Sequence, residues 1–368
     1  MKAVVERDAA QGALAKVTAV IERNHTIPIL ANLLIEAGKG EIAFRGTDLD
    51  LEVVARIGAQ VETPGAATVS AARLADIARN LPAGSEIELT LSEAPSRLAI
   101  RSGRSRFQSP TLPVGDFPAL RAEGQGHRAS MPAKDLAWAM RQTAFAMCRE
   151  ATRYHIGGVN LHVEAGDLVA VATNGHILSR VQVRCPDDWM DAPAITLPAK
   201  TVGEVGRLLA GEDGEVEIWT NGRLFRLEAG PAVLTSKLID ADYPDYRRVI
   251  PKDNPHKLLG DPVELVAAVK RCSLVGDGKS RPVRLELADD APRLTARDGE
   301  GGEAEETLGG EYDGPALKVG FNGAYLRDII GQIAGERVAM ELGTERDPVR
   351  ISDPADDRGL FVIMPLLT

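Results

Sequence analysis

A pattern that recurs three times along the 368 residues leaves this chain few possible folds. Its clearest copy runs from Arg153 to Val183. This copy reads as an extended run, a Gly166-Asp167 turn, an alternating strand over Leu168 to Thr173, a tight Asn174-Gly175 turn and a further strand over Ile177 to Val183. An Asn-Gly pair between alternating apolar segments is the strongest short-range sign of a β-hairpin. The middle of the chain is therefore predicted to be antiparallel β-structure.

Two weaker copies flank this hairpin pattern. The first spans Leu30 to Ile57, about 126 residues earlier, and places Thr47-Asp48 where the central copy has Thr173-Asn174. The third spans Arg281 to Leu308, with its turn at Ala296 to Gly299. Self-similarity at a fixed period indicates an architecture built from repeated units.

Amphipathic segments precede and follow each hairpin in the same order, which predicts six helices over residues 7–21, 71–80, 133–148, 199–209, 261–272 and 322–334. Each copy then closes on another hairpin, ending at Thr111 to Pro118, Ser236 to Pro244 and Leu360 to Thr368. The predicted fold is α+β, with three similar domains. Each domain consists of two βαβββ-like halves whose helices pack on one face of antiparallel sheets.

Two segments without periodicity separate the copies. Ala119 to Arg128 is polar and carries glycines, and Pro251 to Lys257 contains two prolines among charged residues. Taken as linkers, they set domain boundaries at 1–122, 129–250 and 256–368. A domain of about 120 residues is large enough to bury a core of its own.

Positive charge is concentrated in the predicted helices, although the chain carries a net charge of −10. The six helix windows hold seven acidic residues against eleven basic ones: Arg7, Lys16, Arg73, Arg79, Lys134, Arg141, Lys200, Arg207, Lys270, Arg271 and Arg327. Lys134 with Arg141, and Lys200 with Arg207, are seven residues apart and so share a helix face. The overall charge argues against a basic coat for nucleic acid, but the helices alone favour polyanions. Ordinary solvated helix surfaces would also account for such a surplus.

Targeting and redox signals are weak. The N-terminus becomes charged by Glu6 and Arg7, and no apolar run approaches the length of a membrane span, so we expect a cytoplasmic protein that does not contact membranes. The three cysteines, Cys148, Cys185 and Cys272, form no CxxC pair and are expected to be buried thiols in a reducing compartment.

Catalytic signatures are missing from the sequence. Ser273 to Ser280 nearly spells a phosphate-binding loop, but a serine replaces the first glycine and the context runs from helix to strand. Cys148 and His176 could be imagined as nucleophile and base, yet Cys148 ends an apolar helix. The six histidines show no metal-ligand spacing. We therefore expect no enzyme, no metal and no cofactor.

Several blocks resemble the bacterial sliding clamp, the beta subunit of DNA polymerase III. The resemblance is collinear from residue 1 to 368 and is carried by residues 26–34 (TIPILANLL), 46–49 (GTDL), 105–118 (SRFQSPTLPVGDFP), 173–176 (TNGH), 236–251 (SKLIDADYPDYRRVIP), 320–322 (GFN) and 362–365 (VIMP).

This resemblance implies a head-to-tail homodimer whose six domains close into a ring, with sheets outside and helices lining a central hole. Basic helix faces would attract the phosphates of double-stranded DNA without reading bases, so that the ring slides. The expected partners are a clamp loader, the polymerase alpha subunit and other replication and repair proteins that carry short clamp-binding peptides. The chain would confer processivity and perform no catalysis.

The resemblance also implies site residues. The peptide-binding groove is expected to comprise Arg153, Ile156, Thr173, Gly175, His176, Leu178, Pro244, Arg248, Val249, Asn322, Tyr325, Val349, Val362, Ile363, Met364, Pro365 and Leu366. The expected DNA-facing residues are Arg23, Asn24, Arg73, Arg79, Lys134, Arg141, Tyr154, His155, Lys200 and Arg207. At the dimer seam, Phe107 is expected to pack against Leu274 and Val275 of the partner subunit.

Two other functions stay open on the sequence. An enzyme could use the groove at Arg153 and His176 as a small-molecule site, in which case His176→Ala would abolish turnover. A repeat scaffold could bind peptides without DNA, in which case no salt-dependent DNA association would be seen.

Overall fold

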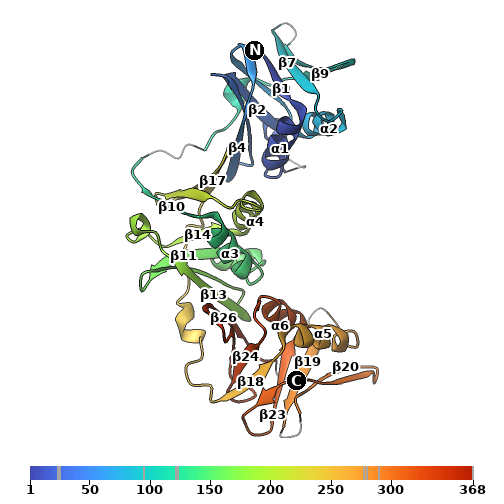
Figure 1. The fold of residues 1–368 in the computed structure, drawn as a ribbon, viewed down its shortest axis with the longest axis vertical. Helices are drawn as coiled ribbons and strands as arrows, with labels where there is room; N and C mark the ends of the chain where they lie inside the picture. Colours follow the sequence, from blue (N-terminus) through green and yellow to red (C-terminus); the bar gives the residue numbers. More distant parts are fainter. Residues whose placement is uncertain are drawn as a thin grey trace. The chain divides into compact units, whose positions relative to one another are not determined.

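A computed structural model describes residues 1–22, 26–93, 96–120, 124–276, 278, 281–288 and 291–366. Helices occur in all six predicted windows (Figure 1): α1 (Arg7–Thr18), α2 (Ala71–Asn80), α3 (Ala133–Ala144), α4 (Ala199–Leu208), α5 (Pro262–Cys272) and α6 (Gly323–Ile330). The α+β fold class is confirmed.

Several helices end earlier than their periodicity predicted. Helix α1 stops at Thr18 instead of Ile21, and α6 stops at Ile330, where Gly331 follows and its N–H bonds back to Arg327 O. The N-terminal ends are set more firmly by side chains. Asp261 Oδ1 accepts the N–H of Val263 at the start of α5, and Asn322 Oδ1 accepts the N–H of Ala324 at the start of α6.

Two sheets belong to the first half of the chain. A five-stranded sheet has the order β5 (Gln60–Thr63), β1 (Lys2–Glu6), β7 (Glu86–Glu93), β8 (Ser96–Ser102), β9 (Ser105–Pro110). An eight-stranded sheet has the order β10 (His127–Pro132), β15 (Glu215–Thr220), β16 (Leu224–Ala229), β17 (Ala232–Lys237), β4 (Leu51–Gly58), β3 (Glu41–Thr47), β2 (Asn32–Gly38), β6 (Gly65–Ser70).

Two more sheets follow. A nine-stranded sheet has the order β14 (Ile195–Pro198), β11 (Gly158–Glu164), β12 (Asp167–Thr173), β13 (Ile177–Arg184), β26 (Asp356–Ile363), β25 (Val349–Asp353), β24 (Val338–Leu342), β18 (His256–Gly260), β22 (Glu311–Tyr312). A four-stranded sheet has the order β21 (Glu303–Thr307), β20 (Arg293–Arg297), β19 (Pro282–Leu287), β23 (Leu317–Asn322).

The βαβββ halves are exchanged rather than separate. The first strand of each half pairs with the three-stranded meander of the other half: β1 with β7, for instance, and β6 with β2. All of these pairings are antiparallel. Neither half could therefore complete its own sheet alone, and the whole repeat is the smallest unit that closes a core.

The two largest sheets also cross repeat boundaries. Strand β17 pairs with β4 through Ser236 and Leu51, and β26 pairs with β13 through Ile363 and Ile177. The chain packs as two compact units, residues 1–137, 186–193 and 200–238 in the first and 138–185, 194–199 and 239–368 in the second. The predicted three-domain boundaries stay a prediction.

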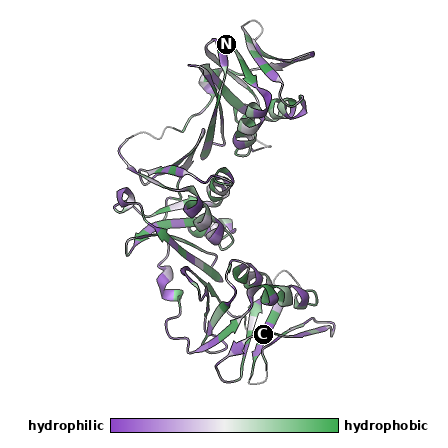
Figure 2. Cartoon of the chain, in the orientation of Figure 1, coloured by the Kyte–Doolittle hydropathy of each residue, from purple (hydrophilic) through white to green (hydrophobic). Residues whose placement is uncertain are grey.

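The linkers are shorter than predicted. Strand β10 begins at His127 and β18 begins at His256, so residues assigned to linkers already make sheet hydrogen bonds. In Figure 2 the hydrophobic residues lie mainly in the strands and helices. All three cysteines are buried and free, as predicted.

One turn design is used at positions 126 residues apart. Thr173 Oγ1 accepts the N–H of Gly175, and Asn174 Oδ1 accepts the N–H groups of His176 and Ile177, which makes a loop longer than the tight turn predicted. Thr47 and Asp48 repeat these bonds, but Leu49 has a φ of 83° where Gly175 has 87°. A leucine thus occupies a left-handed conformation that favours glycine.

Candidate functional site

The predicted peptide-binding residues all lie in the second compact unit. They come from the 3₁₀ turn η3 (Ala151–Ile156), the β12–β13 hairpin, the 3₁₀ turn η5 (Tyr246–Val249) with preceding Pro244, the start of α6, the first residue of β25, and the segment 362–366. We call this set the peptide site. Its buried members are Ile156, Leu178, Val349, Val362 and Ile363, and its exposed members are Gly175, His176, Pro244, Arg248, Val249 and Met364.

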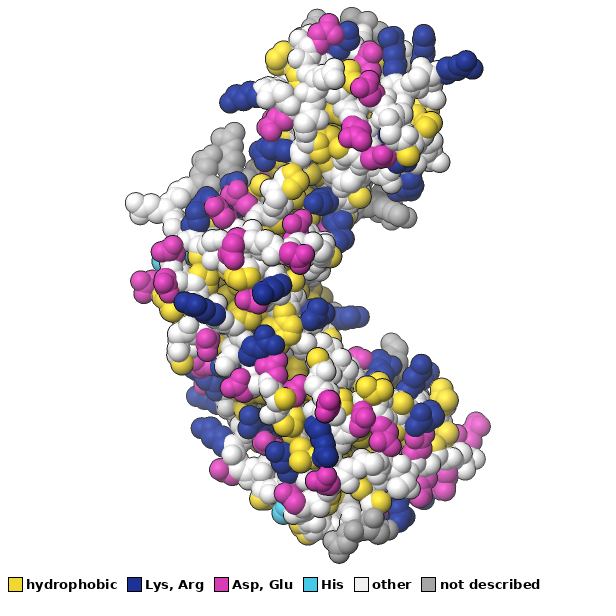
Figure 3. Space-filling view, viewed as in Figure 1, with side chains coloured by type: hydrophobic (Ala, Val, Ile, Leu, Met, Phe, Trp, Pro, Cys, Tyr) yellow, Lys and Arg dark blue, Asp and Glu magenta, His cyan; other side chains and the backbone are white. Residues whose placement is uncertain are grey.

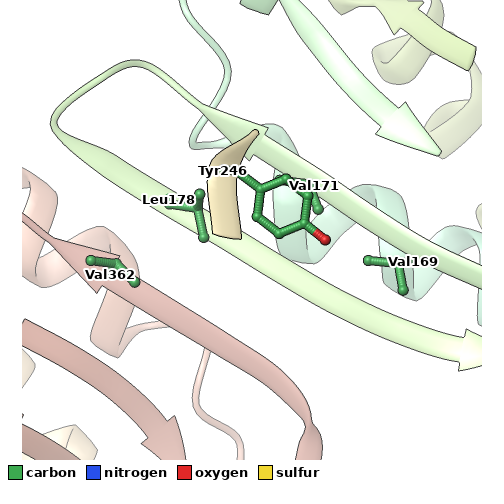
Figure 4. Close-up of a cluster of buried hydrophobic side chains, with 5 residues drawn as sticks. All are labelled: Val169, Val171, Leu178, Tyr246 and Val362. Carbon is green, nitrogen blue, oxygen red and sulfur yellow. The ribbon is translucent and has the colours of Figure 1, made fainter. Parts of the chain in front are cut away.

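An apolar cluster forms the floor of the peptide site (Figure 4). Val169 and Val171 of β12, Leu178 of β13 and Val362 of β26 pack with Tyr246 of η5. Val249 and Met364 stay 46% and 39% exposed beside this floor, although both are large apolar side chains. Exposed apolar side chains beside an apolar floor suit a ligand with an apolar anchor.

Polar groups hold the rim of the peptide site. Arg153 donates to both carboxylate oxygens of Glu150, at 3.0 and 2.7 Å, and to Asn174 O at 2.9 Å. The hydrogen bonds and the positive charge of Arg153 lower the pKa of the Glu150 carboxyl below its ordinary value. A side chain at position 175 would place its Cβ 2.8 Å from Arg153 Nη1, so Gly175 leaves room for the guanidinium.

Backbone bonds attach the C-terminal segment to this rim. Met364 N donates to His176 O, and Leu366 N donates to Gly320 O, both at 2.8 Å. The His176 ring stacks on Tyr325 with centroids 6.2 Å apart. The segment 362–366 is thereby held between two strands, β13 and β23.

The first compact unit contains a counterpart of this site, 126 residues earlier, with opposite polarity. Thr47 pairs with Glu52 in the same register in which Thr173 pairs with Leu178. Glu52 thus replaces the floor residue Leu178. Its carboxylate accepts from Arg45 Nη1 at 2.8 Å and from Leu120 N at 3.2 Å, and burial raises its pKa above the ordinary value while Arg45 opposes the rise.

In the counterpart within the first unit, charged residues replace apolar peptide-site residues at further positions. Arg45 stands where the central repeat has Val171, and it also pairs with Glu36 at 3.4 Å. Lys237 stands where the C-terminal repeat has Met364, and it pairs with Asp50 at 2.9 Å. Of two junctions built on one plan, the first thus has charged residues, within the described part of the chain, at positions that are apolar in the second.

The predicted DNA-facing residues divide into two groups. Arg23 and Asn24 lie outside the described residues, and the other eight lie on α2, α3, α4 and η3. Lys134, Arg141 and Tyr154 are exposed, and in the described ranges no carboxylate lies within ion-pair distance of Lys134 or Arg141. Figure 3 shows Lys and Arg mixed with Asp and Glu on the face it presents.

Three of these cations already have partners inside the first unit: Arg79 forms an ion pair with Asp76, and Arg207 and Lys200 bond to α1 and the residues after it. Arg207 donates to Ala15 O and Lys16 O, at 3.0 and 2.8 Å, and forms an ion pair with Glu204. Lys200 donates to Val20 O and contacts the Asp48 carboxylate. Since the last carbonyls of a helix lack partners within it, Arg207 caps α1. Sequence counting could not separate these structural cations from free ones.

The predicted seam residues lie beside edge strands. Phe107 is on β9, which ends the five-stranded sheet, and is 38% exposed. Leu274 follows α5 and is 75% exposed, while Val275 is half-buried. Strand β21 ends the four-stranded sheet that packs on α5.

Catalytic alternatives gain nothing from the described residues. Among them, no three His, Cys, Asp or Glu side chains gather closely enough to bind a metal ion. Cys148 is buried with its N–H bonded to Ile156 O. The loop resembling a phosphate-binding motif follows α5 and precedes β19, and its residues 277, 279 and 280 lie outside the described part. Within that part, no helix has the length and apolar character needed to span a bilayer.

Comparison with known families assigns the whole chain. Residues 1–121, 130–245 and 247–367 match the N-terminal, central and C-terminal domain families of the DNA polymerase III beta subunit. Together these matches cover nearly all of the sequence.

Individual proteins agree with this assignment over their full length. The beta sliding clamp of Caulobacter vibrioides is 39% identical and that of Escherichia coli K12 is 35% identical, each with full coverage of both chains. The crystal structure of the Caulobacter crescentus clamp superposes with a TM-score of 0.96 at 38% identity. The Bartonella birtlesii clamp, solved bound to griselimycin, superposes with a TM-score of 0.97 at 37% identity, again over both complete chains.

Proposed function

This chain belongs to the bacterial DNA polymerase III beta subunit family and functions as a sliding clamp, and we propose that it does so as a head-to-tail homodimeric ring around double-stranded DNA. The ring tethers the replicative polymerase to its template. Tethering raises the effective concentration of the polymerase at the primer end, so processivity needs no catalysis by the clamp itself. As a replication factor it would work beside the chromosome in the cytoplasm.

Two sheet edges of opposite charge carry the ring proposal. Strands β8 and β9 and the turn between them present exposed Arg97, Arg101, Arg104 and Arg106. Strand β21 and its preceding loop present exposed Glu300, Glu303 and Glu305, of which the last two pair with arginines of β20. Pairing β9 of one subunit with β21 of its partner would satisfy both edges and bring opposite charges together. Because the basic edge and the acidic edge lie on different repeats, the contact is head to tail, and two such contacts close a ring.

Retention on DNA tests this function. A clamp placed on a circular plasmid by its ATP-driven loader is expected to remain through gel filtration and to be lost once the plasmid is linearised, because nothing but topology holds it. A plasmid nicked in one strand is the control, since it stays closed and should keep the clamp. Clamps that stay on linear DNA with open ends would contradict the topological mechanism.

We further propose that partners bind the peptide site through short peptides with apolar anchors. The apolar floor of Val171, Leu178 and Val362 would desolvate a Leu or Phe side chain, and Arg153 and His176 would orient the peptide backbone or a carboxylate. Met364, with its flexible thioether, would adapt to different anchors. Such partners include the clamp loader and the polymerase alpha subunit.

Met364→Asp is expected to weaken peptide binding by at least about tenfold, since it places a charge on the apolar surface that the anchor must cover. Fluorescence anisotropy with a dye-labelled peptide carrying Leu and Phe anchors measures the change. Val263→Asp is the matched control, because Val263 is also an exposed apolar residue, 77% exposed on α5 and outside the peptide site. Equal affinities for both variants would remove Met364 from the site.

A further inference from the structure

A chain of polar groups, with Asn160 and Tyr246 buried and His162 half-buried, adjoins the apolar floor of the peptide site and has no role in the function proposed so far. His162 of β11 bonds through Nδ1 to Asn160 Oδ1 at 2.9 Å and through Nε2 to Tyr246 Oη at 3.1 Å. Tyr246 begins η5, the turn that carries Arg248 and Val249 of the peptide site. The Tyr246 ring packs on the apolar floor in Figure 4.

The hydrogen bonds of Asn160 determine the form of the imidazole. Asn160 Nδ2 donates to Thr196 Oγ1 at 3.1 Å and to Ile195 O at 3.3 Å. Its Oδ1 is therefore the atom that faces His162, and Nδ1 of the ring must donate to it. In the neutral ring, Nε2 is then an acceptor and receives the hydroxyl proton of Tyr246. The Arg180 guanidinium also interacts with the Tyr246 hydroxyl.

The network is complete only with a neutral His162. A proton on Nε2 would reverse the bond: the ring would donate to the Tyr246 oxygen, which already lies near the Arg180 guanidinium, and the Tyr246 hydroxyl proton would lose its acceptor. Four charged or titratable groups surround the ring: Glu164 on the same strand, Arg180 on β13, and Tyr246 and Arg247 on η5. Burial dominates and lowers the pKa of His162, Glu164 opposes this effect, and Arg180 and Arg247 reinforce it.

We infer that His162 and Tyr246 are positioning residues for the peptide site: the neutral imidazole holds the Tyr246 hydroxyl, and this bond fixes the turn that presents Arg248 and Val249 to a bound peptide. Protonation of His162 removes the acceptor of the Tyr246 hydroxyl, loosens the turn and weakens peptide binding. The inference rests on the proposed peptide-binding function. It assigns a role to His162 and to the hydroxyl of Tyr246, whose ring belongs to the apolar floor.

The direction of the pH effect follows from the lowered pKa. Below the ordinary value of 6.5, an unfolded or released His162 takes up a proton that the folded network excludes. The network therefore loses stability as pH falls below 6.5, until the folded site itself becomes protonated. By linkage, a peptide that needs the ordered turn must lower the pKa of His162 further.

The experiment measures the affinity of the full-length clamp between pH 8 and 5.5. The probe is an acetylated and amidated synthetic peptide with Leu and Phe anchors and no ionisable side chain. Loss of one buried hydrogen bond corresponds to roughly fivefold, so we expect wild-type affinity to fall by about that factor at low pH. His162→Gln keeps an acceptor for Tyr246 but does not titrate. We expect this variant to bind the peptide as well as wild type does at pH 8, and its affinity not to decrease at low pH.

Matched variants distinguish the effect of His162 from the effects of other residues. His176→Gln removes the histidine that lines the peptide site, and its affinity for the peptide is still expected to decrease at low pH because His162 is present. Tyr246→Phe is expected to weaken binding about fivefold at pH 8, whereas Tyr312→Phe, which removes a hydroxyl bonded to Pro315 O, should leave affinity unchanged. Nuclear magnetic resonance titration of His162 in the wild type, with and without the peptide, gives the linked pKa shift directly.

Each outcome bears on one proposal. A peptide that binds wild type at no pH contradicts the peptide site itself. A peptide that binds with the same pH profile to wild type and to His162→Gln overturns the positioning role, as does a His162 pKa that the peptide leaves unmoved. The resonance measurement needs no substitution, so it decides the question even where His162→Gln folds poorly.

Discussion

Replacing both Leu274 and Val275 with alanine is expected to convert the dimer into monomers. Leu274 is 75% exposed within the single chain, and the proposed seam would bury it against the partner subunit. Removing most of two aliphatic side chains from a seam forfeits about 2 to 4 kcal/mol of apolar burial, or roughly 30- to 1000-fold in affinity at each seam. A ring has two equal seams, so the loss applies twice.

Sedimentation velocity measures this change, because the mass should fall to the 39.3 kDa of a single chain. Val263→Ala is the control, since Val263 lies on the preceding helix α5, is 77% exposed and is not assigned to the seam. The monomeric variant should also fail to remain on circular DNA. A double variant that sediments as the wild type does would exclude these residues from the seam.

Arg45→Ala is expected to destabilise the first compact unit by about 3 kcal/mol or more. Arg45 bridges Glu36 and the buried Glu52, and its removal leaves Glu52 with the Leu120 N–H as its remaining partner among the described contacts. Breaking a buried ion pair from one side strands a charge, which typically costs about 3 to 5 kcal/mol. Urea-induced unfolding followed by circular dichroism measures the loss.

The pH dependence identifies the stranded carboxylate. Burial raises the pKa of Glu52, so the folded unit retains a proton that the unfolded chain has released, and acid favours folding at this residue. The deficit of Arg45→Ala should therefore shrink as pH falls toward 5. Arg56→Ala is the control, because Arg56 meets Glu41 at 3.6 Å and both side chains are about half exposed. It should cost under about 1 kcal/mol, and equal losses for the two variants would contradict the role of Arg45 as the partner of buried Glu52.

The repeat, the helices and the hairpins could be predicted from the sequence because each depends on local pattern. Asn174-Gly175 and Thr47-Asp48 mark their turns through side chains that bond to neighbouring backbone. The exchange of β1 and β6 between halves could not be predicted, since both halves carry equivalent apolar strands and pattern alone does not choose the partner. Pairing across the repeat boundaries was missed for the same reason.

The peptide-site residues could be predicted from family resemblance, but the difference in polarity between this site and its counterpart in the first unit became visible only in the structure. In the sequence, Glu52 and Leu178 are simply strand residues. The shared register shows that they occupy equivalent positions. The role of Arg207 was also hidden, because a cation on a helix face looks alike in sequence whether it meets DNA or caps α1. His162 gave no signal, since its partners Asn160 and Tyr246 lie on different elements.

The sheets that cross the repeat boundaries have a consequence for how DNA gets inside. Within the first unit β4 and β17 are joined over five residue pairs, and within the second unit β13 and β26 are joined over five more. Opening the proposed ring at either junction would break the strand pairing of a sheet whose strands belong to the folded cores. In the proposed ring, the contacts between subunits join two chains that each keep their own folded core, so these contacts could part and re-form while both cores stay intact. A loader that opens such a ring would therefore do so at the subunit seam, and the two continuous sheets would stay closed.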